Sequence, residues 1–233
     1  FQYSPRAIAG ALQDVGELVR GAEVSDTVAV FERLNHANEY FGHDGINRWA
    51  QAAYNIAMWD AWGKILGQPI WRILGTSRTE VPIYGSGGWI SYSVDELIAE
   101  VSGYKARGFQ AVKIKVGKPD WREDLERLRL VREAVGNDIG IMMDANQGMT
   151  VPNALALARA ARELHIQWFE EPIPHDDFQG YALLRNQAGI SLAMGEREYS
   201  TLPLRELLTR NAIDIWQPDI LRLGGVEAWR NSA

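Results

Sequence analysis

An apolar run followed by an acidic residue recurs three times in the second half of the chain at a constant interval. Twenty-six residues separate Asp144 from Glu170, and 26 again separate Glu170 from Glu196. The apolar runs before them cover residues 139–143, 167–169 and 191–194. One β-strand and one α-helix fit such an interval. The spacing therefore predicts parallel strands that each place a carboxylate at the same edge of a sheet.

The remaining pattern of residues 79–233 agrees with alternating strands and helices. Further strands are expected at 81–84, 111–116 and 213–216, and helices around 97–107, 125–131, 155–164 and 202–208. Ser93 and Glu96 have the spacing of a capping box at a helix start. Acids converging from three successive strands suit the mouth of a (β/α) barrel. An open doubly wound sheet is the alternative that periodicity leaves open.

The first third of the chain has a different character. Residues 7–74 are alanine-rich with helical periodicity, and Gly67, Pro69 and Gly75 interrupt this periodicity near its end. We therefore predict a helical part over residues 1–78 and an α/β part over 79–233. Six strands are visible, whereas a complete eightfold barrel takes roughly 250 residues. We expect an incomplete barrel with six of its eight strands.

Composition narrows the classes of partner. The net charge is −6, from 24 basic and 30 acidic residues, and no long run of like charges suggests nucleic acid or a membrane surface as partner. The chain has no cysteine, which excludes disulfides and thiolate chemistry and favours a cytoplasmic setting. The apolar runs are too short to cross a bilayer. A small molecule is the expected partner.

The three acids predict a metal site. An all-oxygen set without His or Cys suits Mg²⁺ better than zinc or copper. Taken singly, each acid would more simply cap the following helix. Asn146 has the same strand parity as Asp144 and could reach the metal or the substrate, although an ordinary turn asparagine explains it equally well.

Two lysines predict the chemistry. Lys113 and Lys115 are two residues apart on a predicted strand, so both point to one side. On an ordinary strand they would face water, but in a barrel they would face the carboxylates. A bound cation lowers the pKa of a neighbouring lysine, which can then act as a base. Such a site can remove a proton α to a carboxylate and stabilise the resulting enediolate.

Asp219 and His175 are further candidates. Asp219 ends the sixth predicted strand and could orient a histidine, as triad acids do. His36, His43 and His165 are not placed to be that histidine. His175 lies in a loop at the correct end of its strand and could touch substrate, although a surface role is the simpler reading.

The ordered motifs resemble those of the mandelate racemase subgroup of the enolase superfamily. The motifs, in family order, are WDAWGKILGQPIWRILG (59–75), VKIKVG, MMDANQ, WFEEP, MGE and QPDILRLGG. The resemblance implies a helical capping-domain segment followed by a modified TIM-type barrel. It also implies Asp144, Glu170 and Glu196 as Mg²⁺ ligands, Lys115 as the base, Lys113 as its electrostatic partner and Asp219 as the acid of an Asp–His dyad.

The same resemblance separates the two acids of WFEEP. Neighbouring strand residues point to opposite sides, and the family motif matches Glu170 to the ligand. Glu171 is therefore expected to point away, where it accepts hydrogen bonds or pairs with a cation. Two departures remain: the family's dyad histidine lies on a seventh strand, and its first capping-domain strands have no counterpart here. We expect a fragment that lacks the second acid/base and does not turn over normally.

For the intact protein the resemblance implies dehydration of an acid sugar to a 2-keto-3-deoxy acid. Racemisation or epimerisation of a 2-hydroxy acid is the alternative, and a non-catalytic barrel or inactive fragment is the second one. Arg197 and Tyr199 point weakly to a polar substrate cavity. A homo-oligomer is expected.

Overall fold

The computed structural model describes residues 4–76 and 78–233, which form two compact units. The helical unit comprises the chain up to Glu80 together with Gly195–Leu204 and Pro218–Ala233. The sheet unit comprises Val81–Met194 and Arg205–Gln217. The capping-domain and barrel boundary expected near residue 78 stays a prediction, since these units are defined by compactness and not by family domain.

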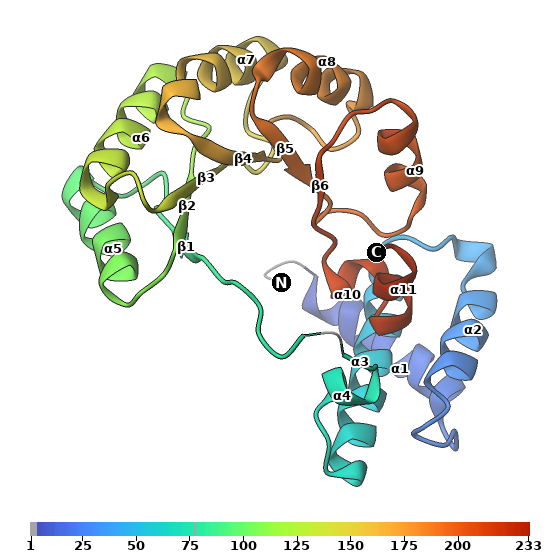
Figure 1. The fold of residues 1–233 in the computed structure, drawn as a ribbon. Coiled ribbons are helices and arrows are strands. Elements are labelled where there is room, and N and C mark those ends of the chain that lie inside the picture. Colours follow the sequence, from blue (N-terminus) through green and yellow to red (C-terminus); the bar gives the residue numbers. More distant parts are fainter. Residues whose placement is uncertain (1–3, 77) are drawn as a thin grey trace. The chain divides into compact units, whose positions relative to one another are not determined.

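The sheet unit holds six parallel strands in the order β1 to β6, the arrangement expected for an incomplete (β/α) barrel. The strands are β1 (Gly85–Gly87), β2 (Ala111–Lys115), β3 (Gly140–Asp144), β4 (Ile166–Glu170), β5 (Ser191–Met194) and β6 (Ile215–Trp216). The helices between them are α5 (Val94–Ala106), α6 (Trp121–Val135), α7 (Val151–Ala160), η2 (Arg162–Leu164), α8 (Phe178–Ala188) and α9 (Leu202–Thr209). The sheet curves, and α5 to α8 cover its outer side (Figure 1).

Alternation along the strands separates the core from the candidate site. Val112 and Ile114 on β2 are fully buried, as are Leu97 on α5 and Leu128 on α6. Lys113 and Lys115 alternate with these two residues along β2 and therefore point to the other side of the sheet. Since helices cover the outer side of the sheet, its inner side is where the polar residues gather.

The first strand lies four residues later than predicted. Residues 81–84 form no strand, and Val81 and Ile83 are exposed, whereas Gly85–Gly87 pairs with β2. A Cβ at Gly85 would overlap the Tyr104 ring, and one at Gly87 would overlap the Glu100 carboxylate. Glycine is therefore needed where α5 packs closely on this strand. The sequence instead predicted the strand at 81–84, directly before these glycines.

Other predicted elements are confirmed with small shifts. Ser93 caps α5 in a full capping box with Glu96, as predicted. The expected helix over 155–164 begins earlier, at Val151, and its last turn is the 3-10 helix η2. The strand expected at 213–216 is shortened to β6.

The helical unit is built from two parts of the chain. Its first part contains α1 (Pro5–Val19), α2 (Thr27–Ala37), η1 (Glu39–Phe41), α3 (Ile46–Leu66) and α4 (Ile70–Ile73). Its last part contains α10 (Ile220–Leu223) and α11 (Val226–Asn231), which pack on α3. A core cluster joins α1, α2 and α3 through Val15, Val30, Leu34, Ala50 and Met58.

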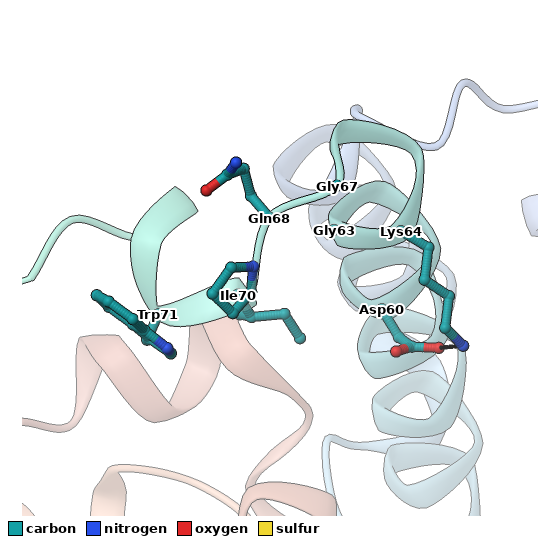
Figure 2. A pocket seen from close by; sticks show the side chains of 8 residues that line it. Asp60, Gly63, Lys64, Gly67, Gln68, Ile70 and Trp71 are labelled. Atoms are coloured by element: carbon teal, nitrogen blue, oxygen red, sulfur yellow. Dashed lines mark hydrogen bonds and ion pairs between the residues drawn. The ribbon is translucent and has the colours of Figure 1, made fainter. Parts of the chain in front are cut away.

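Helix α3 ends at Gly67, which adopts a left-handed conformation (φ 62°), and Pro69 precedes α4. A pocket of about 530 Å³ lies at this end of the helix, with Trp71 on one side and the Asp60–Lys64 ion pair on the other (Figure 2). No helix in residues 4–76 and 78–233 is both long and apolar enough to cross a membrane.

Candidate functional site

Four charged side chains meet at the carboxyl ends of β2, β3 and β4. Lys113 Nζ lies 2.7 Å from Glu170 Oε2 and 3.6 Å from Asp144 Oδ2. Lys115 Nζ lies 2.5 Å from Asp144 Oδ2. Because Lys115, Asp144 and Glu170 are partners in register across the three strands, backbone pairing alone aligns them. Both ammonium groups thus face the carboxylates, as predicted.

Burial and charge act together on this cluster. Burial disfavours the Lys113 ammonium, but the hydrogen bond and charge of Glu170, assisted by Asp144 and Tyr84, outweigh it and raise the pKa of Lys113. Burial, reinforced by the charge of Asp144, raises the pKa of Glu170 against the opposing effect of Lys113. The site therefore holds two acids that repel each other, and the positive charge of the lysines offsets this repulsion only in part.

Two aromatic residues frame the buried pair. The Tyr84 ring centroid lies 5.5 Å from Lys113 Nζ, and Trp168 Nε1 donates to Glu170 Oε2 at 3.4 Å. The Tyr84 and Trp168 rings meet edge to face at 5.5 Å. Sequence reasoning missed both. Trp168 was discoverable, since it precedes Glu170 by two residues and shares its side of the strand; Tyr84 precedes β1 and carries no such signal.

The loop after β3 binds the second lysine. Asn146 Oδ1 accepts a hydrogen bond from Lys115 Nζ at 2.7 Å, and its backbone N–H donates to Asp144 Oδ1 at 2.9 Å. Asn146 has a positive φ of 43°, a conformation that asparagine tolerates better than most residues. The structure therefore brings Asn146 to the site, in contact with Lys115.

The two acids of WFEEP separate as expected. Glu171 is fully buried, has φ 36° and accepts a hydrogen bond from Gln147 Nε2 at 3.2 Å, while Glu170 faces Lys113. Gln147 Oε1 also accepts from the backbone N–H of His175 at 3.1 Å. Gln147, which sequence reasoning did not single out, thus ties the loops after β3 and β4 together. The role of His175 in binding substrate stays a prediction.

The remaining predicted residues lie in the helical unit. Glu196 Oε1 is 3.6 Å from Arg197 Nε, and Asp219 caps α10 by accepting from the N–H groups of Leu221 and Arg222. Over the described ranges, no three His, Cys, Asp or Glu side chains form a ready metal-binding group. The metal role of Glu196 and the dyad role of Asp219 stay predictions.

The residues of the sheet unit fit a hard divalent cation in donor chemistry. Two buried carboxylates stand side by side at the ends of paired strands, and the side-chain carbonyl of Asn146 lies on the loop that directly follows one of these strands. Carboxylate and carbonyl oxygens are the ligand atoms that Mg²⁺ prefers.

Known proteins resemble this chain over most of its length. Residues 96–233 match the family described as enolase C-terminal domain-like. The L-talarate/galactarate dehydratase of Salmonella typhimurium is 32% identical over 97% of this chain and 58% of its own length. The 3,6-anhydro-alpha-L-galactonate cycloisomerase of Streptomyces coelicolor is 30% identical over 95% of this chain and 61% of its own.

A solved structure extends the likeness to the fold. A racemase from Streptomyces coelicolor A3(2), solved with bound magnesium, superposes with a TM-score of 0.94 at 28% identity, covering 99% of this chain and 65% of that one. The chain spans about three fifths of the length of these two curated relatives, which are a lyase and an isomerase by name. The protein belongs to the enolase C-terminal domain-like family of the enolase superfamily, in the mandelate racemase group that its ordered motifs indicate.

Proposed function

We propose that the intact protein removes the α-proton of a carboxylate substrate with the help of Mg²⁺, and that the reaction is dehydration of an acid sugar to a 2-keto-3-deoxy acid. The observation that carries this proposal is the placement of Lys115. Its ammonium group contacts Asp144 and Asn146, and its side chain is 16% exposed, against 9% for Lys113. Lys115 is the more accessible of two lysines beside paired acids.

Each residue of the site has a separate role in the proposed reaction. Asp144 and Glu170, with Glu196 from the next strand-helix repeat, would hold Mg²⁺. When bound, the ion supplies positive charge where negative charge develops on the substrate carboxylate. Lys115 would act as the neutral amine, whose Nζ lone pair accepts the α-proton and so becomes an ammonium, and the hydrogen bond from Lys115 to Asn146 fixes where Nζ lies. The buried Lys113 keeps its proton and adds a fixed positive charge.

Asp219 remains our candidate for the acid that orients a catalytic histidine. In dehydration that histidine would protonate the departing β-hydroxyl, and in racemisation it would act on the opposite face of the substrate. Asp219 has one carboxylate oxygen committed to capping α10, which fixes the side chain in one orientation. A fixed carboxylate suits an orienting role.

The choice of dehydration rests on the relatives. The curated dehydratase and cycloisomerase act, by name, on acid-sugar compounds, which supports a polyhydroxylated carboxylate as the substrate. The likeness to a magnesium-bound racemase favours racemisation or epimerisation as the second candidate. Both reactions begin with the same proton transfer to or from the α-carbon, so the base assignment is common to them.

The test follows product and exchange together. We would incubate the full-length protein with Mg²⁺ in D₂O and a panel of acid sugars and 2-hydroxy acids, recording 2-keto product and α-deuterium incorporation. Keto product identifies a dehydratase, whereas exchange with inversion and no loss of water identifies a racemase. If no substrate of the panel gives keto product or α-deuterium exchange, the proposal is wrong.

The base assignment needs a variant and a control. In Lys115→Ala, the rate of α-proton exchange on one face of the substrate should fall by about 10²-fold or more. The control is Lys118→Ala, which removes a lysine three residues further on that pairs with Glu123; its exchange rate should equal that of the wild type. Undiminished exchange in Lys115→Ala would show that another group is the base.

A further inference from the structure

A tight loop follows β1 at the carboxyl end of the sheet. It begins at Gly88, which has φ 60° and leaves no space for a side chain, because a Cβ would overlap Ile114 and crowd Leu97. The backbone N–H of Lys115 donates to Gly88 O at 3.1 Å. The start of this loop is therefore bonded directly to the residue we propose as the base.

Two side chains from neighbouring helices hold the loop. Arg127 on α6 is buried and donates to the carbonyl oxygens of Gly88 at 2.9 Å, Trp89 at 3.0 Å and Tyr92 at 3.3 Å. Glu100 on α5 accepts from the N–H of Gly88 at 2.5 Å. Burial of a guanidinium is costly unless its donors find acceptors, and here the backbone carbonyls of this loop accept from both terminal nitrogens of Arg127, although its buried Nε has no hydrogen-bond partner. The loop is consequently fixed in one conformation.

This fixed loop presents an exposed tryptophan beside Lys115. Trp89 is 54% exposed, and its ring centroid lies 5.7 Å from Lys115 Nζ. A tryptophan stabilises a fold by burying its large ring, yet here a rigid backbone leaves half of that surface open. A half-exposed indole held at a proton-transfer site is placed to contact a ligand.

We infer that Trp89 is a specificity-determining residue whose indole face packs against the carbon chain of a polyhydroxylated acid held at Lys115. This inference rests on the proposed function. The carbon chain of such an acid carries polarised C–H bonds between its hydroxyl groups. The negative face of an aromatic ring attracts positively polarised groups, as it does the Lys115 ammonium. Longer chains would therefore gain more from Trp89 than shorter ones.

Two variants separate aromatic stacking from simple bulk. Trp89→Phe keeps a ring, and Trp89→Leu keeps an apolar side chain without one. The matched control is Trp71→Leu, since Trp71 is 42% exposed and lies on α4 in the helical unit (Figure 2). Each would be made in the full-length protein with Mg²⁺, and KM, kcat and calorimetric affinity measured for acid sugars of decreasing chain length.

The expected result is a length-dependent loss of binding. Trp89→Leu should weaken the affinity for the longest acid sugar and raise its KM by about 10-fold, roughly the factor expected from losing one aromatic contact. The effect should shrink as the chain shortens, and kcat should change less than KM. Trp89→Phe should stay within about threefold of the wild type, and Trp71→Leu should not differ from it.

Other outcomes overturn the inference in distinguishable ways. If the wild type is active and Trp89→Leu retains its KM for every chain length, Trp89 does not contact substrate, while the proposed function stands. If Trp89→Leu lowers kcat equally for all lengths, it acts through Lys115 and not on specificity. If the wild type neither binds nor converts any acid sugar, the proposed function fails and this inference fails with it.

Discussion

The two lysines of the site differ in what surrounds them. Lys113 lies between Glu170 and Asp144 with Tyr84 against it, and little of it is exposed. Lys115 shares Asp144 with Lys113 and contacts the exposed Asn146. A buried ion pair is costly to break, because the remaining charge is left without a partner. The surroundings thus suit Lys113 to a fixed charge and Lys115 to proton transfer.

Removal of Lys113 should destabilise the protein unless a cation replaces it. In EDTA, Lys113→Met leaves Glu170 and Asp144 facing each other, so we expect a loss of about 3 kcal/mol in the free energy of unfolding, measured with urea. Added Mg²⁺ should recover part of this loss. Lys64→Met, which breaks an exposed pair with Asp60, should have little effect. An equal loss with and without Mg²⁺ would argue against a metal at these carboxylates.

The raised pKa of Glu170 gives a pH dependence of definite sign. In the folded protein Glu170 keeps its proton to a higher pH than in the unfolded chain, where its pKa is near 4.5. Between the two pKa values the folded state binds more protons, so wild-type stability falls as pH rises through this window. The side chain in Glu170→Gln cannot ionise, so the stability of this variant does not decrease in this way as pH rises.

The measurement is urea unfolding in EDTA from acidic to neutral pH. The free energy of unfolding of Glu170→Gln, relative to the wild type, should increase as pH rises from about 4.5 and then level off. Glu126→Gln, which changes an exposed carboxylate on α6, is the control and should show no such trend. A difference that stays flat across the pH range would mean that the pKa of Glu170 is the same in the folded and the unfolded protein.

At the scale of secondary structure, helix starts are set by local capping. Ser93 Oγ accepts from the N–H of Glu96, and the Glu96 carboxylate accepts from the N–H and hydroxyl of Ser93. This capping box lies directly after the loop that follows β1 and carries Trp89. It begins α5, which carries Glu100. The position of one helix start thus influences how the loop after β1 is held.

Loss of this cap should destabilise α5 by a measurable amount. Ser93→Ala should lower the free energy of unfolding by about 1 kcal/mol, since one backbone N–H at the helix start loses its acceptor. Ser91→Ala is a suitable control, because Ser91 is exposed, lies two residues earlier and is not the N-cap of α5. Urea unfolding would compare them, and equal stability of the two variants would show that the box contributes nothing.

At the scale of the whole molecule, the helical unit depends on contacts between distant parts of the chain. Trp59 Nε1 on α3 donates to Glu227 Oε1 on α11 at 2.9 Å, across 168 residues of sequence. Nearby, Asn55 Oδ1 accepts from the N–H of Val226, and Arg48 Nε donates to Leu223 O. These polar contacts are buried, so each loss leaves a group without a partner.

Trp59→Phe tests this link. It removes the donor and leaves a buried Glu227 oxygen unsatisfied, which should cost about 1 to 3 kcal/mol of unfolding free energy. Trp62→Phe is the matched control, since the Trp62 ring contacts the Trp59 ring in a tilted arrangement, whereas the hydrogen bond to Glu227 comes from Trp59. Thermal unfolding of both variants would measure the difference. Equal unfolding temperatures would mean that the Trp59 hydrogen bond is dispensable.

Much of the sheet unit follows from local pattern. The repeat of strand and helix, the parity of Lys113 and Lys115 and the places of Asp144 and Glu170 are properties of short periods, and the structure has them as predicted. The position of β1 was wrong, because glycine is required there by the approach of Tyr104 and Glu100 from α5. Only packing reveals that requirement.

The sequence by itself determined the family, the alternation of strands and helices, and which charged residues share one side of the sheet. These depend on the period of two along a strand and on the ordered motifs. Only the tertiary structure decided that Trp168 and Tyr84 frame the Lys113 pair, that Arg127 holds the Trp89 loop and that Glu227 accepts from Trp59. Those partners are brought together by packing between elements distant in sequence, and a local sequence pattern does not predict which of their side chains will be in contact.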